Sequence, residues 1–167
     1  MTRQLRAHIL GIAAATLLGA LWLLWRGPAP VVRGTEVLDA TVPFWYMISA
    51  FPFFGILLAE SWLEWPTRRG KTLLVQLLII VLISILRLTL FIPISGHLLL
   101  LSFFLLWTMN NLEQPYLTEY ILGVGVLMLL VYTKVFVWQD AMTAVWGVAM
   151  AFVIWWVGQR LAPIDAS

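Results

Sequence analysis

Residues 72–109 read TLLVQLLIIVLISILRLTLFIPISGHLLLLSFFLLWTM, and this segment decides the fold class. It holds two apolar runs, 72–92 and 95–109, which meet at Pro93. The first run is about as long as a helix that crosses a bilayer, and the second is shorter. Proline ends the first run because it lacks a backbone N–H and disfavours helical geometry in the residue before it. The segment therefore predicts two membrane helices joined by a tight turn.

The composition extends this interpretation to the whole chain. Of 167 residues, 62% are hydrophobic and 11% are charged, and the mean hydropathy is +0.96. A soluble domain would carry about a quarter charged residues. We therefore expect one integral membrane domain over 1–167, an all-α polytopic transmembrane helix bundle. It should have about six spans, near 8–25, 43–62, 72–92, 95–109, 116–138 and 140–157.

Other compositional features exclude whole classes of function. The chain has no cysteine, which excludes disulfides, thiolate nucleophiles and cysteine-ligated metals. Two histidines far apart and no cluster of carboxylates predict no metal site, and we expect no cofactor. A net charge of +2 does not indicate a nucleic-acid partner. Ten tryptophans fit a protein with many interfacial anchors.

The connections between the spans predict an orientation. Arg68, Arg69 and Lys71 make the most basic loop, and an even number of spans places it on the same side as both termini. Basic loops face the cytoplasm, so both termini should be cytoplasmic and the turns at 93–97 and 138–140 should face outward. The cell inner (cytoplasmic) membrane is the expected location.

The first two spans carry further local signals. Trp22, Trp25 and Arg26 suit a cleavage region poorly, so the first span is interpreted as retained, with a cleaved signal peptide as the alternative. Residues 27–42 are expected to form a loop. Pro52 and Gly55 are expected to kink the second span.

Ionisable residues at membrane depth are costly and indicate function. Glu60 and Glu119 lie near the cytoplasmic ends of their spans, where we expect them to reach interfacial water. Arg87, Lys134 and Asp140 lie near the outer ends of three other spans. Lys134 could extend along its stem to water, and Asp140 could cap the last helix or pair with Lys134.

The turn at 93–97 adds groups that suit an anion. Ser95 and Gly96 open a helix, whose first N–H groups bind anions, and Gly96 permits close backbone approach. Arg87 suits phosphate through its bidentate geometry. His97 could donate a proton to a leaving oxygen. These four residues predict a phosphate cradle beside a proton donor.

The stretch Pro93-Ile94-Ser95-Gly96-His97 resembles the Pro-Ser-Gly-His motif of the type 2 phosphatidic acid phosphatase superfamily. Those proteins are six-helix membrane enzymes that remove phosphate from lipids, and this motif opens their fourth helix. The segment Thr133-Lys134-Val135-Phe136 resembles the Ser-Arg opening of the family's third motif, and Asp140 resembles its aspartate. The family's third motif also holds a histidine that attacks phosphorus, and no histidine follows His97 in this chain.

The resemblance implies a role for each matching residue. His97 would be the general acid and Asp140 a second catalytic group, while Arg87, Ser95, Gly96 and Lys134 would bind the phosphate. The implied partner is a membrane lipid with a phosphorylated headgroup, at the outer face. Three functions stay open: a divergent lipid phosphatase that uses water directly, a non-catalytic headgroup binder, and an accessory, transporter-like or structural subunit. The sequence leaves the oligomeric state open.

Overall fold

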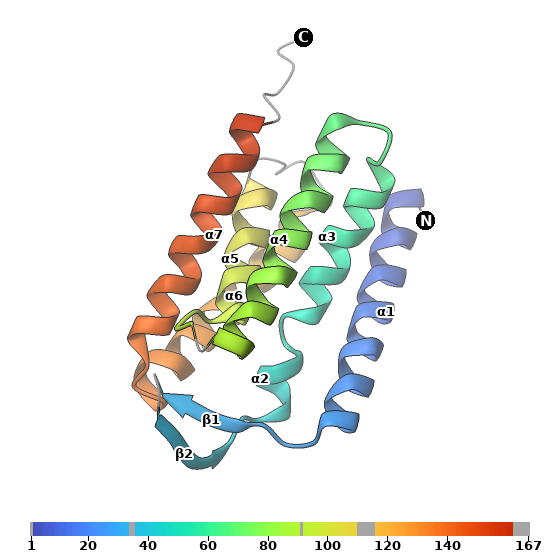
Figure 1. Ribbon diagram of the computed structural model, residues 1–167. Coiled ribbons are helices and arrows are strands. Elements are labelled where there is room, and N and C mark those ends of the chain that lie inside the picture. The colour runs from blue at the N-terminus through green and yellow to red at the C-terminus, as the bar shows by residue number, and fades with distance from the viewer. Residues whose placement is uncertain (1, 34–35, 91, 110–115, 162–167) are drawn as a thin grey trace.

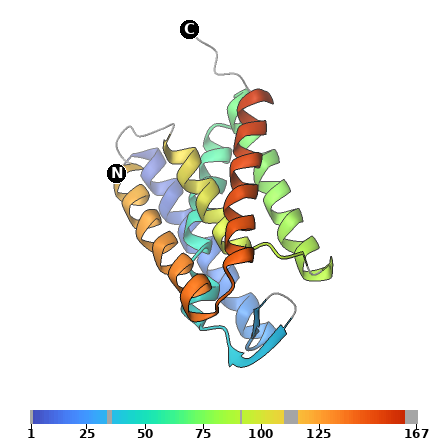
Figure 2. The same ribbon diagram turned by 90° about the vertical axis from the view of Figure 1, so that its left-hand side faces the viewer.

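A computed structural model describes residues 2–33, 36–90, 92–109 and 116–161 as a bundle of helices with a small β-hairpin at one end (Figure 1). The elements, in order, are α1 (Arg3–Arg26), β1 (Pro30–Arg33), β2 (Glu36–Thr41), α2 (Phe44–Ile48), α3 (Phe51–Leu63), α4 (Arg68–Leu90), α5 (Gly96–Met109), α6 (Tyr116–Tyr132), the π-helix η1 (Thr133–Val137) and α7 (Ala141–Leu161). Helix α1 begins and α7 ends at the end of the bundle opposite the hairpin (Figures 1 and 2).

The expected all-α transmembrane bundle is confirmed. In the described part of the chain, five helical stretches are long and apolar enough to cross a membrane: 3–26, 44–63, 68–87, 117–137 and 141–160. Helix α5 is apolar but has only 14 residues, as the short fourth run predicted. Residues 110–115, which connect the fourth and fifth expected spans, and residues 162–167 lie outside the described residues.

The loop expected over 27–42 is wrong, because most of it forms an antiparallel β-hairpin. Val31 pairs with Leu38, and Val32 pairs with Val37. Branched side chains at these positions favour extended backbone, which explains the strands. Val31 is 1% exposed, so the hairpin packs onto the bundle through this side chain.

The second span is interrupted as expected, but the break precedes Pro52. Helix α2 ends at Ile48, and α3 begins at Phe51 with Pro52 in its first turn. Proline is tolerated there because the first N–H groups of a helix have no intrahelical partner. Gly55 serves packing instead of a kink. A Cβ atom built on it would lie 2.3 Å from the carbonyl oxygen of Gly11, so α1 and α3 cross almost backbone to backbone.

Helix α5 forms the centre of the bundle. It packs against α3, α4, α6 and α7, and its side chains from Leu98 to Leu105 are all buried. Gly147 of α7 lies against the start of α5, where an added Cβ would come within 2.8 Å of the Ser95 carbonyl oxygen. The start of α5 is therefore held deep among its neighbours.

Candidate functional site

A cavity of about 550 Å³ opens at the hairpin end of the bundle. We call it the hairpin-side cavity. Its polar or cationic lining residues are Arg26, Tyr46, Ser84, Arg87, Ser95, His97 and Lys134, and Gly96 also lines it. Apolar side chains from α1, α3 and α4 supply much of the remaining wall, among them Leu23, Phe51, Phe54, Ile80, Val81 and Ile85. Five of the six predicted site residues therefore line one cavity.

Arg87 joins the last turn of α4 to the segment before α5. Its Nη1 donates a hydrogen bond to the carbonyl oxygen of Ile94 at 2.7 Å. A Cβ atom on Gly96 would lie 3.4 Å from this Nη1 and 3.3 Å from Oγ of Ser84. The guanidinium is thus held directly beside the backbone that opens α5, as the phosphate-cradle prediction requires.

Two hydroxyl groups in this region are buried close enough to act on each other, and neither makes a hydrogen bond of normal geometry. They belong to Ser95, which is 2% exposed, and to Tyr46, which is also 2% exposed. The Ser95 backbone N–H donates to the Thr143 carbonyl oxygen at 3.0 Å, which fixes the residue while leaving its side chain unused. A buried hydroxyl without a partner costs free energy, so each group is a place where a ligand can supply the missing hydrogen bond.

His97 is fixed by its backbone and ring contacts. Its Nε2 lies 3.0 Å from the carbonyl oxygen of Met47, to which it must donate, because a carbonyl oxygen only accepts. Its ring lies 5.0 Å from the ring of Tyr46, which lies 4.5 Å from that of Trp138. In the neutral tautomer that this bond selects, Nδ1 is an acceptor.

Lys134 and Asp140 form an ion pair across the end of η1. Lys134 Nζ lies 2.9 Å from Asp140 Oδ2, and the ammonium also lies 5.1 Å from the centre of the Trp138 ring. The Thr143 hydroxyl donates to Asp140 Oδ2 at 2.6 Å, and its backbone N–H approaches Oδ1 at 3.4 Å. Asp140 thus pairs with Lys134 and caps α7, two of the alternatives that the sequence left open.

The electrostatics of Asp140 follow from these contacts. Burial by itself would raise the pKa of this carboxyl, but the Thr143 hydroxyl and the Lys134 ammonium outweigh burial and hold the pKa below its ordinary value. Asp140 is therefore ionised, and it does not line the cavity. Asp140 therefore has no direct access to a ligand in the cavity, which its predicted catalytic role would require.

Sequence reasoning missed the contributions of α1 and α2 to this cavity. Arg26 and Trp22 line it from the end of α1, with the guanidinium carbon 5.2 Å from the Trp22 ring centre. Tyr46 enters from α2. The sequence offered a clue to Arg26, because it is a cation that ends a span on the expected outer side. Nothing in the sequence places Tyr46 beside Ser95.

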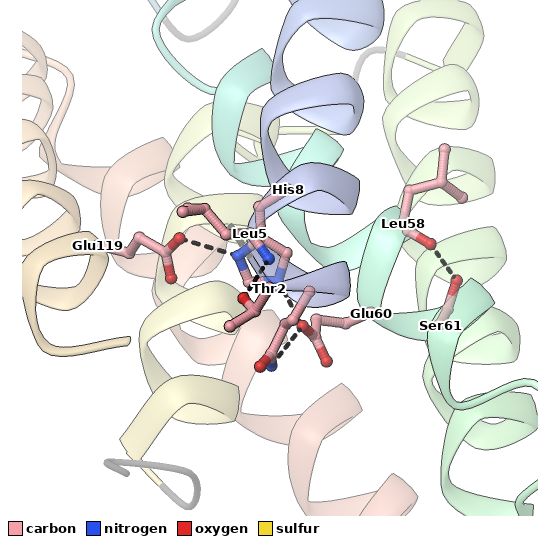
Figure 3. Close-up of polar contacts among 8 residues, drawn as sticks. Thr2, Leu5, His8, Leu58, Glu60, Ser61 and Glu119 are labelled. Atoms are coloured by element: carbon pink, nitrogen blue, oxygen red, sulfur yellow. Dashed lines mark hydrogen bonds and ion pairs between the residues drawn. The ribbon is translucent and has the colours of Figure 1, made fainter. Parts of the chain in front are cut away.

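The expectation that Glu60 reaches interfacial water is wrong, because Glu60 is 1% exposed. It contacts His8, which is equally buried and also contacts Glu119. This second polar group lies at the end of the bundle away from the hairpin (Figures 1 and 3). In the described ranges, no three histidine or acidic residues are arranged to hold a metal ion.

Comparison with known proteins adds no further constraint. No family model, curated protein or solved structure matches this chain.

Proposed function

We propose that this protein binds the phosphorylated headgroup of an anionic membrane lipid in the hairpin-side cavity. One observation carries the proposal. Arg26, Arg87 and Lys134 line a largely apolar cavity, and the described lining residues include no carboxylate. A concave apolar pocket with a few convergent cations suits a ligand that is both anionic and apolar.

The polar end of the cavity suits phosphate. Arg87 donates one of its five N–H groups to the carbonyl oxygen of Ile94. Its other N–H groups can form bidentate hydrogen bonds to an anion. The Ser95 hydroxyl makes no hydrogen bond of normal geometry and can donate to the same anion. Both adjoin the first turn of α5, where helix N–H groups favour negative charge.

The apolar walls suit the lipid's hydrocarbon part. They come from α1, α3 and α4, whose outer faces carry many exposed leucine and isoleucine side chains, as expected for contact with lipid. The ligand class is therefore a lipid phosphomonoester or diphosphate. The resemblance of residues 93–97 to the type 2 phosphatidic acid phosphatase motif implies the same class.

Binding has more support than turnover. Hydrolysis is the second candidate because His97 lines the cavity, but its ring would first have to gain a proton on Nδ1 before it could protonate a leaving oxygen. Asp140, however, is committed to Lys134 and Thr143. The described lining of the cavity includes no carboxylate that could activate water. Non-catalytic binding is the function we propose first.

The charge distribution supports a proposal for the location. Exposed Arg3, Arg6, Arg68 and Lys71 belong to the end of the bundle away from the hairpin. On the hairpin, Arg33 is balanced by Glu36 and Asp39. The positive-inside rule supports a cytoplasmic placement of both termini and an outer-face cavity in the cell inner membrane.

Binding of phosphatidic acid to the purified full chain in detergent, measured by native mass spectrometry, tests the proposal. Diacylglycerol is the matched ligand without phosphate, and glycerol phosphate is the matched ligand without tails. We expect phosphatidic acid to bind at least about tenfold more tightly than either, since charge-assisted hydrogen bonds contribute about 1.5–3 kcal/mol. Equal binding of phosphatidic acid and diacylglycerol would refute it.

Two variants locate the site. Ser95→Ala removes a hydroxyl whose only hydroxyl neighbour is the weakly placed Tyr46, so folding should change little while phosphatidic acid binds severalfold more weakly. Arg87→Gln should weaken binding by about tenfold or more. Arg160→Gln, at an exposed position at the other end of α7, is the matched control and should bind normally. Release of inorganic phosphate by the wild type, lost in His97→Ala, would make hydrolysis the function.

A further inference from the structure

A second polar cluster lies at the end of the bundle away from the hairpin, outside the proposed lipid site. It consists of His8 on α1, Glu60 on α3 and Glu119 on α6, and we call it the His8 cluster. His8 Nε2 bonds to Glu60 Oε1, and His8 Nδ1 lies 2.9 Å from Glu119 Oε1. Figure 3 shows the imidazole of His8 between the two carboxyl groups. His8 and Glu60 are each 1% exposed.

Hydrogen-bond accounting requires an additional proton in this cluster. A neutral imidazole has one donor nitrogen and one acceptor nitrogen, whereas an ionised carboxylate only accepts. With a neutral ring and two carboxylates, one of the two contacts would place two acceptors face to face. Both contacts can be hydrogen bonds only when the cluster holds one proton more than a neutral imidazole and two ionised carboxylates do.

The surroundings indicate which group carries the proton. Gln4 Nε2 also donates to Glu60 Oε1, at 3.2 Å, so this oxygen acts as an acceptor twice. That arrangement suits an ionised Glu60 and a donating His8. The second oxygen of Glu119 is buried without a hydrogen-bond partner, which leaves room for a further proton on this side.

We propose that His8, Glu60 and Glu119 form a proton-binding site in which the imidazolium of His8 is held between two carboxyl groups. Ionisable groups buried at membrane depth need partners, and carboxyl–histidine sets are the usual protein groups for holding protons there. The ligand of this site is the proton itself.

Other charged groups near the cluster do not replace its proton. Glu64, just beyond the end of α3, acts on Glu60 but pairs with Arg69 at 3.3 Å. Arg3 and Arg6 on α1 are exposed. Tyr120 adjoins Glu119 on α6, and α5 has no titratable side chain from Leu98 to Met109. Among the described residues, Glu60 and Glu119 are the charged groups that act on His8.

The proton has a structural role because its ligands come from three helices. Helices α1 and α3 pack closely, and α6 packs mainly on α5 and continues into η1. The contact between His8 and Glu119 is therefore a bond between helices that otherwise share little surface. Loss of the proton leaves one ring nitrogen facing an acceptor oxygen, which favours separation of α6 from α1 or α3.

Nitrogen-15 NMR of the full chain in nanodiscs, with labelled histidine, tests the proposal directly. The chain has only two histidines, so His97→Gln assigns the spectrum without changing the cluster. At about pH 8, where an unperturbed histidine is almost entirely neutral, we expect both ring nitrogens of His8 to be protonated. A neutral His8 ring under these conditions would overturn the proposal.

Matched variants test the part played by the carboxyl groups. Glu60→Gln and Glu119→Gln keep an acceptor oxygen but remove the charge, so His8 should become neutral at the same pH when both are combined. Glu64→Gln is the control and should leave the His8 resonances unchanged. Neutral His8 in the control, or a fully protonated ring in the double variant, would contradict the assignment.

Discussion

At the scale of single residues, Asp140 shows how one carboxylate stabilises two features. It pairs with Lys134 from the end of η1 and accepts hydrogen bonds from Thr143 at the start of α7. Its backbone N–H also donates to the Lys134 carbonyl oxygen at 2.8 Å, which closes the turn at Gln139, whose φ is +51°. The carboxylate and the turn therefore depend on each other.

Asp140→Asn should lower the stability of the protein at neutral pH by up to about 3 kcal/mol, because it leaves the largely buried Lys134 ammonium without an anion. The folded-state pKa of Asp140 lies below its ordinary value, so its contribution is complete above about pH 4 and is lost as pH falls through the folded value. The wild type should thus lose stability on acidification, and the variant should lose less.

Apparent melting temperatures in detergent across this pH range measure the effect. Asp39→Asn, at an exposed position on β2, is the control and should follow the wild-type curve. An acid profile of Asp140→Asn that matches the wild type would show that the carboxylate contributes nothing.

At the residue scale, the informative signal in the sequence is position along a span. The sequence places Arg87, Ser95, Gly96, His97 and Lys134 at the same ends of neighbouring spans, and in the structure they line one cavity. The His8 cluster was missed because its contacts join residues 52 and 111 positions apart. A local sequence pattern cannot indicate a contact between residues that lie so far apart in the sequence.

At the scale of elements, hydropathy located the helices but not their irregularities. Hydropathy measures how readily apolar side chains transfer into lipid. This explains why the expected spans agree with the observed helices α1, α4, α5 and α7. The hairpin, the break between α2 and α3, and the π-turns of η1 depend on backbone hydrogen bonding and on packing. Average hydropathy does not measure either of these.

Gly55→Ala should destabilise the contact between α1 and α3 by about 1–3 kcal/mol, because its Cβ would lie 2.3 Å from the Gly11 carbonyl oxygen and the helices would have to separate. Gly125→Ala on α6 is the matched control. Its Cβ would have no neighbour within 4 Å, so it should be neutral or stabilising by up to about 1 kcal/mol. Thermal unfolding in detergent distinguishes the two, and equal melting temperatures would contradict the close crossing.

At the scale of the whole molecule, the two ends of the bundle differ in kind. One end has the hairpin and the cationic cavity, and the other has the chain termini, the basic loop before α4 and the His8 cluster (Figures 1 and 2). Helix α1 reaches both, from His8 to Arg26, and so does the helical run from α6 through η1, from Glu119 to Lys134. From an even number of spans, the sequence predicted that the termini and the basic loop would share one end, but it predicted neither the hairpin nor the His8 cluster.

Cysteine labelling tests the orientation, because the native chain has no cysteine. Val37→Cys places a thiol on the exposed hairpin, and Pro66→Cys places one in the exposed turn before α4. In intact cells, a membrane-impermeant maleimide should label Val37→Cys, whereas Pro66→Cys should react only after the membrane is permeabilised. The reverse pattern would place the termini and the basic loop outside.

The shortness of α5 has a consequence for the membrane around the protein. Fourteen helical residues extend about 21 Å, whereas the hydrocarbon layer of a typical bilayer measures about 30 Å. Because α5 is enclosed by other helices, of which α4, α6 and α7 are longer, the mismatch falls inside the protein, and at least one end of α5 lies below the lipid surface. If the missing length is on the hairpin side, a bound phosphate would sit several ångströms deeper than the headgroups of surrounding lipids. Bilayer thickness would then set how far a lipid must sink to be recognised.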